Sequence, residues 1–314
     1  MKLFITGISG LLGLNFALQV KNRFEVSGCY LAHPVELEGV RTFRQDVTDF
    51  NSLEELLMTL NPDVIVHTAG LTNVEECELN PMAAHRIHVL ATRHIAQIAR
   101  ALEARLVHIS TDHLFSGATP WITESAPPDP LNVYARTKWE SEQVAREFCQ
   151  DVLIVRTNFY GWGTTVRVSF SDWIFQSLAG GRPLSMFTDV FFTPILLNDL
   201  IDVVAGLVDR QAVGVYHVAG AERLSKYSFA VQMADIFNQP RDPIHAASVN
   251  SFPFKAARPG DMSLCSKKAE KFLRIQMPDV GQGLKKLKGL EQKGWPRVLE
   301  EAVQMPARLD IRHA

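Results

Sequence analysis

The chain has 314 residues, of which 46% are hydrophobic and 21% are charged, a composition typical of a globular protein with a full apolar core. The 32 lysines and arginines nearly balance the 34 aspartates and glutamates, so the charge gives no indication of nucleic acid or an anionic membrane as a partner. No uninterrupted apolar stretch reaches the roughly 18 residues of a membrane span, so we expect no membrane insertion.

The first half of the chain alternates short apolar runs with amphipathic segments. The runs expected to form strands are residues 3–5, 24–26, 64–66, 106–109 and 152–155. The helical patterns between them lie near residues 12–21, 50–60, 82–103 and 134–149. Apolar strands that alternate with helices predict an α/β fold of the Rossmann type, a doubly wound parallel sheet covered by helices on both faces.

The pattern changes after residue 157, where glycines and Pro183 divide the chain into short pieces. One more strand is expected at residues 213–218, and the proline-rich stretch of residues 241–259 predicts loops with short elements. We therefore expect two domains that interleave, with the smaller one holding a substrate over the carboxyl ends of the strands. The dinucleotide-binding domain would comprise residues 1–157 with a returning segment near 194–219, and the substrate-binding domain residues 158–193 and 220–314.

A glycine-rich turn follows the first expected strand, with Gly7, Gly10 and Gly13 in the spacing G-x-x-G-x-x-G. In a dinucleotide-binding turn the first glycine permits a tight bend, the second lets the backbone approach the pyrophosphate, and the third lets the helix pack closely on the sheet. The phosphates would lie at a helix N-terminus, where free N–H groups favour an anion. The full set of predicted cofactor residues is Gly7, Ser9, Gly10, Leu11, Leu12, Gly13, Asp46, Val47, Thr68, Ala69, Gly70, Tyr134 and Lys138, with Asp46 and Val47 expected to receive the adenine.

The choice of cofactor depends on the end of the second strand. A site that prefers NAD usually has an acidic residue about 20 positions after the glycines, bonded to the ribose 2′-hydroxyl. Residues 28–33 contain no acid, which leaves room for a 2′-phosphate, although Arg41 and Arg44 come only later in the sequence. The sequence therefore favours NADP(H) over NAD(H).

Three side chains predict the chemistry of the site. Thr111 follows the apolar run of residues 106–109, at a strand end that faces the ligand crevice of a doubly wound sheet. Tyr134 and Lys138 are four residues apart in a helical pattern, so they share one helix face. An ammonium near a phenol stabilises the phenolate and lowers its pKa, so the phenol can deliver a proton to a carbonyl oxygen near neutral pH. We therefore predict Thr111, Tyr134 and Lys138 as catalytic residues.

These motifs occur in a longer pattern, which is carried by residues 110–117, Pro120-Trp121, Glu124, residues 130–134, Thr137-Lys138, Arg156-Thr157, residues 192–194 and residues 258–260. With them the chain resembles the extended short-chain dehydrogenase/reductase family, and within it the dTDP-4-dehydrorhamnose reductase group. The resemblance covers nearly the whole chain, up to about residue 295.

The resemblance implies a cytoplasmic enzyme of dTDP-rhamnose and polysaccharide biosynthesis. NADPH would deliver hydride to the C4 carbonyl of a nucleotide-linked 4-keto-6-deoxy sugar, and Tyr134 would protonate the nascent alkoxide. Lys138 would bond the nicotinamide ribose and tune Tyr134, while Thr111 would orient the carbonyl. The residues implied for the nucleotide-sugar substrate are Thr72, Val74, Asp112, His113, Asn158, Phe159 and Arg258. Four scattered cysteines without a Cys-x-x-Cys motif agree with a cytoplasmic protein, and no metal site is visible.

Two departures from the group leave alternatives open. His113 stands where the group usually has a tyrosine, and His88 stands where many relatives have an asparagine that supports a proton relay. One alternative is a sugar-nucleotide epimerase or dehydratase, although His113 cannot serve as the carboxylate expected there. Another is a non-catalytic, NADP-binding regulator, since the chain also resembles the regulatory β subunit of methionine adenosyltransferase. The sequence does not determine which nucleotide and which keto sugar the substrate contains, or whether the protein is a homodimer.

Overall fold

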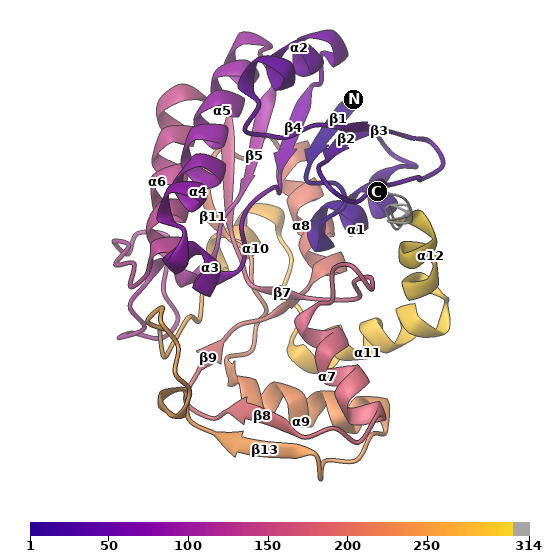
Figure 1. Ribbon diagram of the computed structural model, residues 1–314, viewed down its shortest axis with the longest axis vertical. Helices are drawn as coiled ribbons and strands as arrows, with labels where there is room; N and C mark the ends of the chain where they lie inside the picture. The colour runs from indigo at the N-terminus through magenta and orange to yellow at the C-terminus, as the bar shows by residue number, and fades with distance from the viewer. Residues whose placement is uncertain (304–314) are drawn as a thin grey trace, which may run out of the picture.

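The computed structural model describes residues 1–303, and a seven-stranded parallel sheet forms its centre (Figure 1). The strands lie in the order β11-β6-β5-β4-β1-β2-β3, and every neighbouring pair is parallel. They comprise β1 (Lys2–Thr6), β2 (Glu25–Tyr30), β3 (Val40–Arg44), β4 (Val64–His67), β5 (Arg105–Ile109), β6 (Val152–Arg156) and β11 (Gly214–His217). The predicted Rossmann-type α/β fold is confirmed.

Side chains of the central strands divide between two apolar cores because successive residues of a strand point to opposite faces. In β1, Leu3 and Ile5 belong to one core and Phe4 to the other. In β6, Leu153 packs in the first core and Ile154 in the second. Both faces are therefore buried, which explains why the sequence shows apolar runs rather than alternation.

Helices cover both faces of the sheet, as Figure 1 shows. The second core is formed with α2 (Phe50–Leu60), α5 (Ala91–Ala101) and α6 (Val133–Phe148). The first core is formed with α1 (Leu11–Val20) and α8 (Leu197–Asp209), which contact each other. The long middle helix predicted at residues 82–103 is continuous but contains a π-helical turn, and its parts are α4 (Pro81–His85), η1 (Arg86–Leu90) and α5.

A crevice for a ligand is expected where the strand order reverses, between β1 and β4. The turn after β1 and the loop after β4 are in contact there, since a Cβ added to Gly7 would lie 2.9 Å from Ala69 Cα. Gly7 also has φ 68°, a conformation that other L-residues rarely adopt. A Cβ on Gly13 would lie 2.4 Å from the Gly7 carbonyl oxygen, so only glycine fits where α1 crosses the turn.

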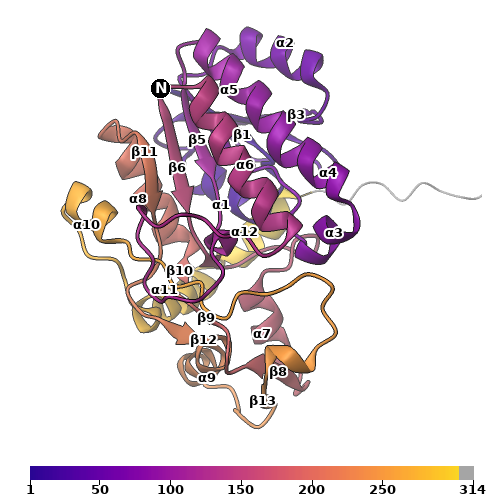
Figure 2. The same ribbon diagram turned by 90° about the vertical axis from the view of Figure 1, so that its left-hand side faces the viewer.

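The second half of the chain forms shorter elements, many of which lie beneath the sheet in both views (Figures 1 and 2). Its strands are β7 (Phe159–Tyr160), β8 (Leu184–Phe187), β9 (Phe191–Phe192), β10 (Ile195–Leu196), β12 (Leu224–Ser225) and β13 (Ile244–Ala247). Besides α8, its helices are α7 (Phe170–Ala179), α9 (Lys226–Phe237), α10 (Lys267–Leu273), α11 (Val280–Gln292) and α12 (Trp295–Ala302), with one 3-10 turn at Val249–Ser251. Another 3-10 turn, Asp112–Leu114, follows β5 in the first half of the chain.

The division into two domains at the residues given above stays a prediction. β11 joins the central sheet, and α12 is tied to α1 by a hydrogen bond of 2.8 Å from Trp295 Nε1 to Asn15 Oδ1. Residues 304–314, part of the predicted substrate-binding domain, lie outside the described residues. Within residues 1–303, no helix is long and apolar enough to cross a membrane, and no cluster of His, Cys, Asp and Glu could hold a metal ion.

Candidate active site

The N-terminus of α1 forms a cradle for an anion. Gly10 is the N-cap, no side chain caps the helix, and its first turn contains no acidic residue. The first backbone N–H groups of a helix have no intrahelical partner, so those of Leu11 and Leu12 are available to a ligand. The small Gly7 and Gly10 leave the approach to them open, so the predicted residues fit a pyrophosphate.

A buried hydrogen-bond chain beneath this cradle positions the loop after β4. Thr92 Oγ1 gives its proton to a backbone carbonyl, so it accepts from His67 Nε2 at 3.1 Å. His67 Nδ1 must then accept from Thr6 Oγ1 at 2.8 Å. Thr6 Oγ1 in turn accepts from the N–H groups of Thr68 and Ala69, both at 3.2 Å. Burial, reinforced by the charge of Lys138, lowers the pKa of His67 to about 3, so this imidazole is neutral.

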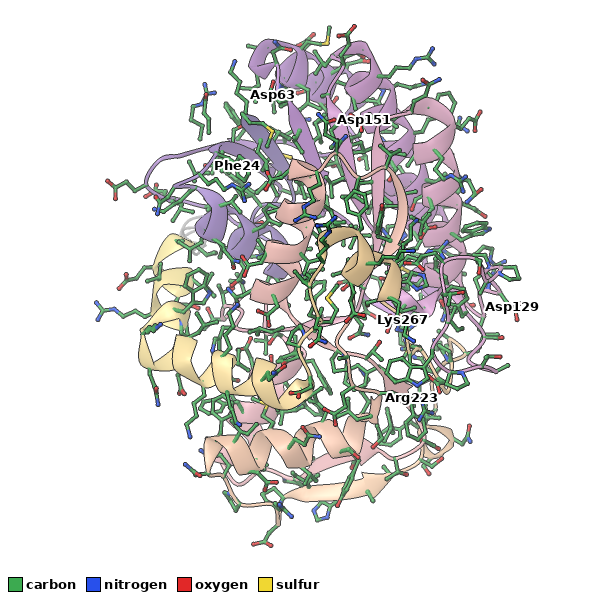
Figure 3. All side chains as sticks on the ribbon, turned by 180° about the vertical axis from the view of Figure 1, so that it is seen from behind. Phe24, Asp63, Asp129, Asp151, Arg223 and Lys267 are labelled. Atoms are coloured by element: carbon green, nitrogen blue, oxygen red, sulfur yellow. The ribbon has the colours of Figure 1, made fainter. Side chains whose placement is uncertain are left out.

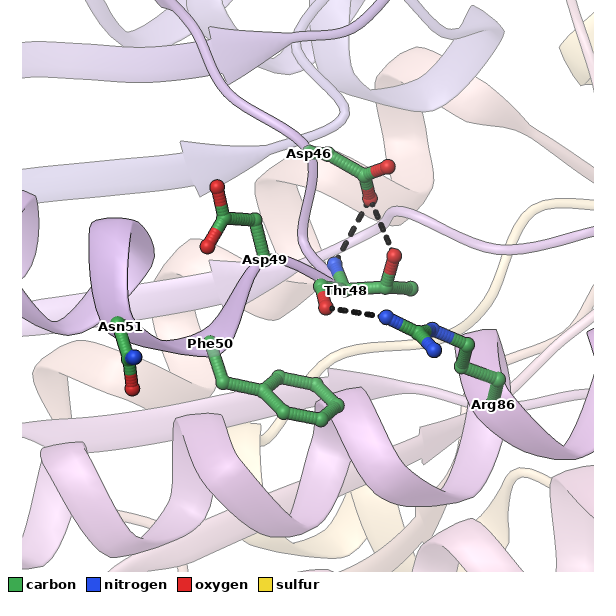
Figure 4. Close-up of a pocket in the computed structure, with 6 residues that line it drawn as sticks. All are labelled: Asp46, Thr48, Asp49, Phe50, Asn51 and Arg86. Atoms are coloured by element: carbon green, nitrogen blue, oxygen red, sulfur yellow. Dashed lines mark hydrogen bonds between the residues drawn. The ribbon is translucent and has the colours of Figure 1, made fainter.

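A cavity of about 310 Å³ adjoins Asp46, which the sequence predicts to receive the adenine (Figure 4). Asp46 Oδ1 accepts hydrogen bonds from the N–H and the hydroxyl of Thr48, at 2.8 and 2.9 Å. Arg86 reaches over from η1 and donates to the Thr48 carbonyl at 3.0 Å, with Phe50 near its guanidinium. Val47 is buried next to this turn, so its backbone rather than its side chain faces a ligand.

The end of β2 carries an unpartnered polar atom. His33 Nδ1 is buried and has no hydrogen-bond partner among residues 1–303. It stands in the segment where an NAD-preferring site usually has its acid, directly after Leu31 and Ala32. A buried imidazole nitrogen without a partner fits a ligand oxygen, and it cannot repel a phosphate as a carboxylate would.

Tyr134 lies in the first turn of α6 beside the buried hydroxyl of Thr111. Asn132 caps this helix through a hydrogen bond of 2.9 Å from Ala135 N–H. Burial raises the pKa of Tyr134 to about 12, and a hydrogen bond with Thr111 opposes that rise. The phenol is therefore protonated at neutral pH, which suits a proton donor rather than a base.

No lowering of the Tyr134 pKa by Lys138 is seen in this structure, so the tuning of Tyr134 by Lys138 stays a prediction. Lys138 shares the helix face, but its Nζ donates to the Ile109 carbonyl at the end of β5, at 2.8 Å. Its ammonium is not among the groups that lower the pKa of Tyr134. Burial lowers the pKa of Lys138 itself to about 8, against the charge of Glu142. Spacing of four residues placed the pair correctly, but the direction of the lysine side chain depends on the strand beneath it.

Two histidines flank the Tyr134 ring. His88 and His113 each meet it edge to face, with ring centroids 5.8 and 5.6 Å from that of Tyr134. His88 Nε2 accepts from the Leu71 N–H at 3.0 Å, so its Nδ1 donates to Thr137 Oγ1 at 2.8 Å. The ring of His88 is therefore engaged on both sides, whereas His113 Nδ1 is buried and has no partner in the described part of the chain.

The residues implied for substrate binding fall into two groups. Asp112 and Asn158 meet at the carboxyl ends of β5 and β6, through a hydrogen bond of 2.6 Å from Asn158 Nδ2 to Asp112 Oδ2. Arg258 is instead paired with Glu75 of α3 (Val74–Leu79), at 2.8 Å. Apart from His113, the remaining candidates are the exposed Thr72, the buried Val74 and the half-buried Phe159 of β7. Within residues 1–303, no side-chain hydrogen bond or ion pair joins these three to Asp112, Asn158 or Arg258.

Sequence reasoning missed two charged residues of this region. Glu75 accepts from the N–H of Lys255 at 2.9 Å as well as from Arg258, so it ties α3 to the segment before Arg258. Lys226 lies over the ring of Phe192 with its Nζ 3.3 Å from the centroid, and its charge is felt by His113. Both residues act on groups that are distant in the sequence, so no local pattern could have found them.

The chain matches the family model described as RmlD substrate binding domain over residues 1–290. Among curated proteins it is 28% identical over 289 residues to the probable low-salt glycan biosynthesis reductase Agl14 of Haloferax volcanii, which covers 90% of this chain and 96% of that protein. It is also 28% identical to methionine adenosyltransferase 2 subunit beta of Bos taurus, over 96% of this chain and 89% of that protein. Identity to the dTDP-4-dehydrorhamnose reductase of Escherichia coli is 27%, over 77% and 84%.

Two solved structures are similar over nearly their whole length. A hypothetical dTDP-4-dehydrorhamnose reductase from Sulfolobus tokodaii is 31% identical with a TM-score of 0.79, covering 90% of this chain and 99% of that chain. A dTDP-4-dehydrorhamnose reductase from Bacillus anthracis, solved in complex with NADP, has a TM-score of 0.81 at 24% identity, covering 91% and 98%.

Proposed function

The chain belongs to the RmlD substrate binding domain family, and from this we propose that it reduces the 4-keto group of a nucleotide-linked 6-deoxyhexose with NADPH. The coarser expectation, a nucleotide-sugar oxidoreductase, is borne out by the reductases among its relatives. The observation that carries the finer proposal is the pairing of Thr111 and Tyr134, a half-buried, neutral phenol beside a buried hydroxyl at the carboxyl end of β5.

The roles proposed for the residues follow from their positions. Tyr134 gives its proton to the substrate oxygen as negative charge develops there, because a phenol with a raised pKa enters the reaction protonated. Thr111 holds that oxygen with a hydroxyl hydrogen bond, a contribution of roughly 3 kcal/mol for a preorganised donor. Lys138 is bonded to Ile109 with one of its three ammonium protons and keeps two for the nicotinamide ribose.

The cofactor would be held by the uncapped N-terminus of α1 and by the loop that Thr6 positions. When bound, NADPH supplies the hydride of the reduction. The preference for NADP(H) is supported by the absence of an acid at the end of β2 and by the unpartnered Nδ1 of His33. It is also supported by the NADP complex of the reductase from Bacillus anthracis. His113, an imidazole rather than a carboxylate beside Tyr134, favours a reductase over a dehydratase.

The direct test is oxidation of NADPH by the purified protein in the presence of dTDP-4-keto-6-deoxyhexose, followed by the loss of NADPH absorbance. We expect turnover that depends on the sugar nucleotide and is faster with NADPH than with NADH. Consumption of NADPH that never depends on any nucleotide-linked keto sugar would contradict the proposal.

A second candidate function is favoured by the similarity to methionine adenosyltransferase 2 subunit beta over 96% of this chain. In that case the chain would bind a dinucleotide and act on a partner protein without turnover. The effect of a change at Tyr134 distinguishes the two proposals. A reductase loses its rate when Tyr134 is changed, whereas a regulator keeps its effect on the partner.

We also predict a loss of activity in alkaline solution that originates from Lys138. Because its pKa is lowered to about 8, the ammonium loses its proton above that pH, and kcat/KM should fall there rather than near the ordinary lysine value of about 10.4. Deprotonation of Lys138 does not unfold the protein in this range. Between about pH 8 and 10.4 Lys138 is protonated in the unfolded chain but not in the folded one, so its contribution to the free energy of unfolding rises with pH in that window.

The measurement is a pH profile of kcat/KM from about 6 to 10, for the wild type and Lys138→Arg. Arginine stays charged across this range, so the variant should lose the part of the alkaline decline that comes from Lys138 and keep any part that comes from Lys226, whose pKa is also lowered to about 8. The same alkaline decline in both proteins would rule out Lys138 as its origin.

A further inference from the structure

Lys226 is a cation that the protein holds without giving it a hydrogen-bond acceptor. Its Nζ lies 3.3 Å from the ring centroid of Phe192 and 4.9 Å from that of Phe170. No hydrogen bond or ion pair links this ammonium to any residue within 1–303. An ammonium has three protons to donate, and aromatic faces satisfy its charge but not those protons.

Two other lysines in the described residues lie over aromatic rings, and both differ from Lys226. Lys268 Nζ is 4.2 Å from the centroid of Tyr216 and donates to the Val215 carbonyl at 2.5 Å. Lys288 Nζ is 5.9 Å from that of Phe237 and donates to a backbone carbonyl at 2.7 Å. At these two positions the ammonium over the ring also donates a hydrogen bond to a backbone carbonyl. Lys226 Nζ makes no such hydrogen bond within residues 1–303.

The backbone places Lys226 rigidly at the edge of the candidate active site. It is the first residue of α9, directly after β12, and its N–H donates to the Val190 carbonyl at 3.1 Å. β12 pairs with β9, and Phe191 of β9 bonds the segment that includes Gly260. That segment is in contact with Gly117, shortly after Asp112 in the chain, because a Cβ on Gly117 would lie 2.8 Å from Gly260 N.

Charges confirm which groups surround the ammonium. Burial lowers the pKa of Lys226 to about 8, and the carboxylate of Asp112 opposes this. Burial also lowers the pKa of His113, and Lys226 and Arg258 act in the same direction. Asp112 is already bonded to Asn158, whereas His113 Nδ1 is buried without a partner in the described residues. Both His113 and Lys226 feel the charge of Asp112. Arg223, labelled in Figure 3, does not compete, because Asp261 binds its guanidinium at 2.6 Å.

We propose that Lys226 binds the diphosphate of the nucleotide-linked sugar. This inference rests on the proposed function, because a dTDP-linked sugar brings a diphosphate, an oxygen-rich anion, to the side of the ring away from the reacting C4 carbonyl. His113 meets the Tyr134 ring edge to face and feels the charge of Lys226, so it would contact the sugar. The cation over Phe192 is then a binding residue rather than a counter-charge for Asp112.

The test measures binding, so it needs no turnover. Calorimetric titration of dTDP into protein saturated with NADP⁺ compares the wild type, Lys226→Met, Lys226→Arg and the matched control Lys268→Met. Loss of one charge-assisted hydrogen bond should weaken dTDP binding about tenfold or more in Lys226→Met. Lys226→Arg should retain most of the affinity, and Lys268→Met all of it. Thymidine, which lacks phosphates, should bind Lys226→Met and wild type equally.

Equal dTDP affinity in Lys226→Met and wild type would overturn the inference, as would a wild-type protein that does not bind dTDP. An equal loss for thymidine and dTDP would also overturn it, because it would indicate a structural role beside Asp112. The proposed function is judged separately. A protein that reduces the keto sugar but is indifferent to Lys226 contradicts only this inference, and dTDP binding that needs Lys226 stands even if no keto sugar is reduced.

Discussion

Replacing Tyr134 by phenylalanine is expected to lower kcat with the sugar nucleotide by roughly 10²- to 10⁴-fold. The phenol is the neutral, half-buried proton donor beside Thr111, and phenylalanine keeps the ring between His88 and His113 while removing only the hydroxyl. Binding of NADPH and the unfolding midpoint should change little. The measurement is single-turnover oxidation of NADPH, together with a fluorescence titration of NADPH.

A matched control is Tyr216→Phe. Tyr216 is also a buried tyrosine with a raised pKa, but it lies on β11 under Lys268, away from the glycine turn. Its variant should turn over as fast as the wild type. Equal rates for the wild type and Tyr134→Phe would remove the assignment of Tyr134 as proton donor and would favour the regulatory candidate.

Replacing Arg156 by methionine is expected to destabilise the fold by roughly 3–5 kcal/mol, because it leaves a buried charge without its partner. The carboxylate of Glu142 is fully buried and accepts from Arg156 Nη2 at 2.7 Å and Nε at 2.9 Å. Ser110 also donates to it, at 2.5 Å. This network joins α6 to the ends of β5 and β6, so it supports the helix that carries Tyr134 and Lys138.

Urea denaturation followed by circular dichroism measures this loss as a lower midpoint. The double variant Arg156→Met with Glu142→Met should regain much of the stability, since neither charge is then buried alone. Arg297→Met is the matched control, because Arg297 pairs with Glu301 on the exposed surface of α12. A midpoint for Arg156→Met no lower than that of the control would show that the buried pair contributes nothing.

Much of the fold could be predicted from the sequence because it is encoded locally. Apolar runs such as residues 64–66 and 152–155 indicated buried strands, and their alternation with helices indicated a parallel sheet. The glycine turn could be predicted for the same reason, since Gly7 has a positive φ and a Cβ on Gly13 would lie only 2.4 Å from the Gly7 carbonyl oxygen. The π-helical turn at Arg86–Leu90 was not readable, because it changes the helical repeat without a local signal.

The sequence predicted only part of the candidate site. Motif spacing predicted Thr111, Tyr134 and Lys138 as one site, and the structure shows a raised pKa for Tyr134 where a lowered one was expected. A side chain's pKa depends on burial and on charges that come from several elements, and these are set by packing. His113 was identified as a departure, and only the fold shows that its Nδ1 is buried beside Tyr134 without a partner among residues 1–303.

The sequence by itself determined the sheet, the cradle for a dinucleotide and the residues at the proposed reaction centre, because each depends on patterns within a few turns of chain. Tertiary structure alone decided the charges around that centre. Asp112 acts on the pKa of Lys226 from a distant part of the sequence, and Glu75 accepts from Arg258 across 183 positions. Electrostatic interactions act through space, so the partner of a charge becomes known only when the chain is folded.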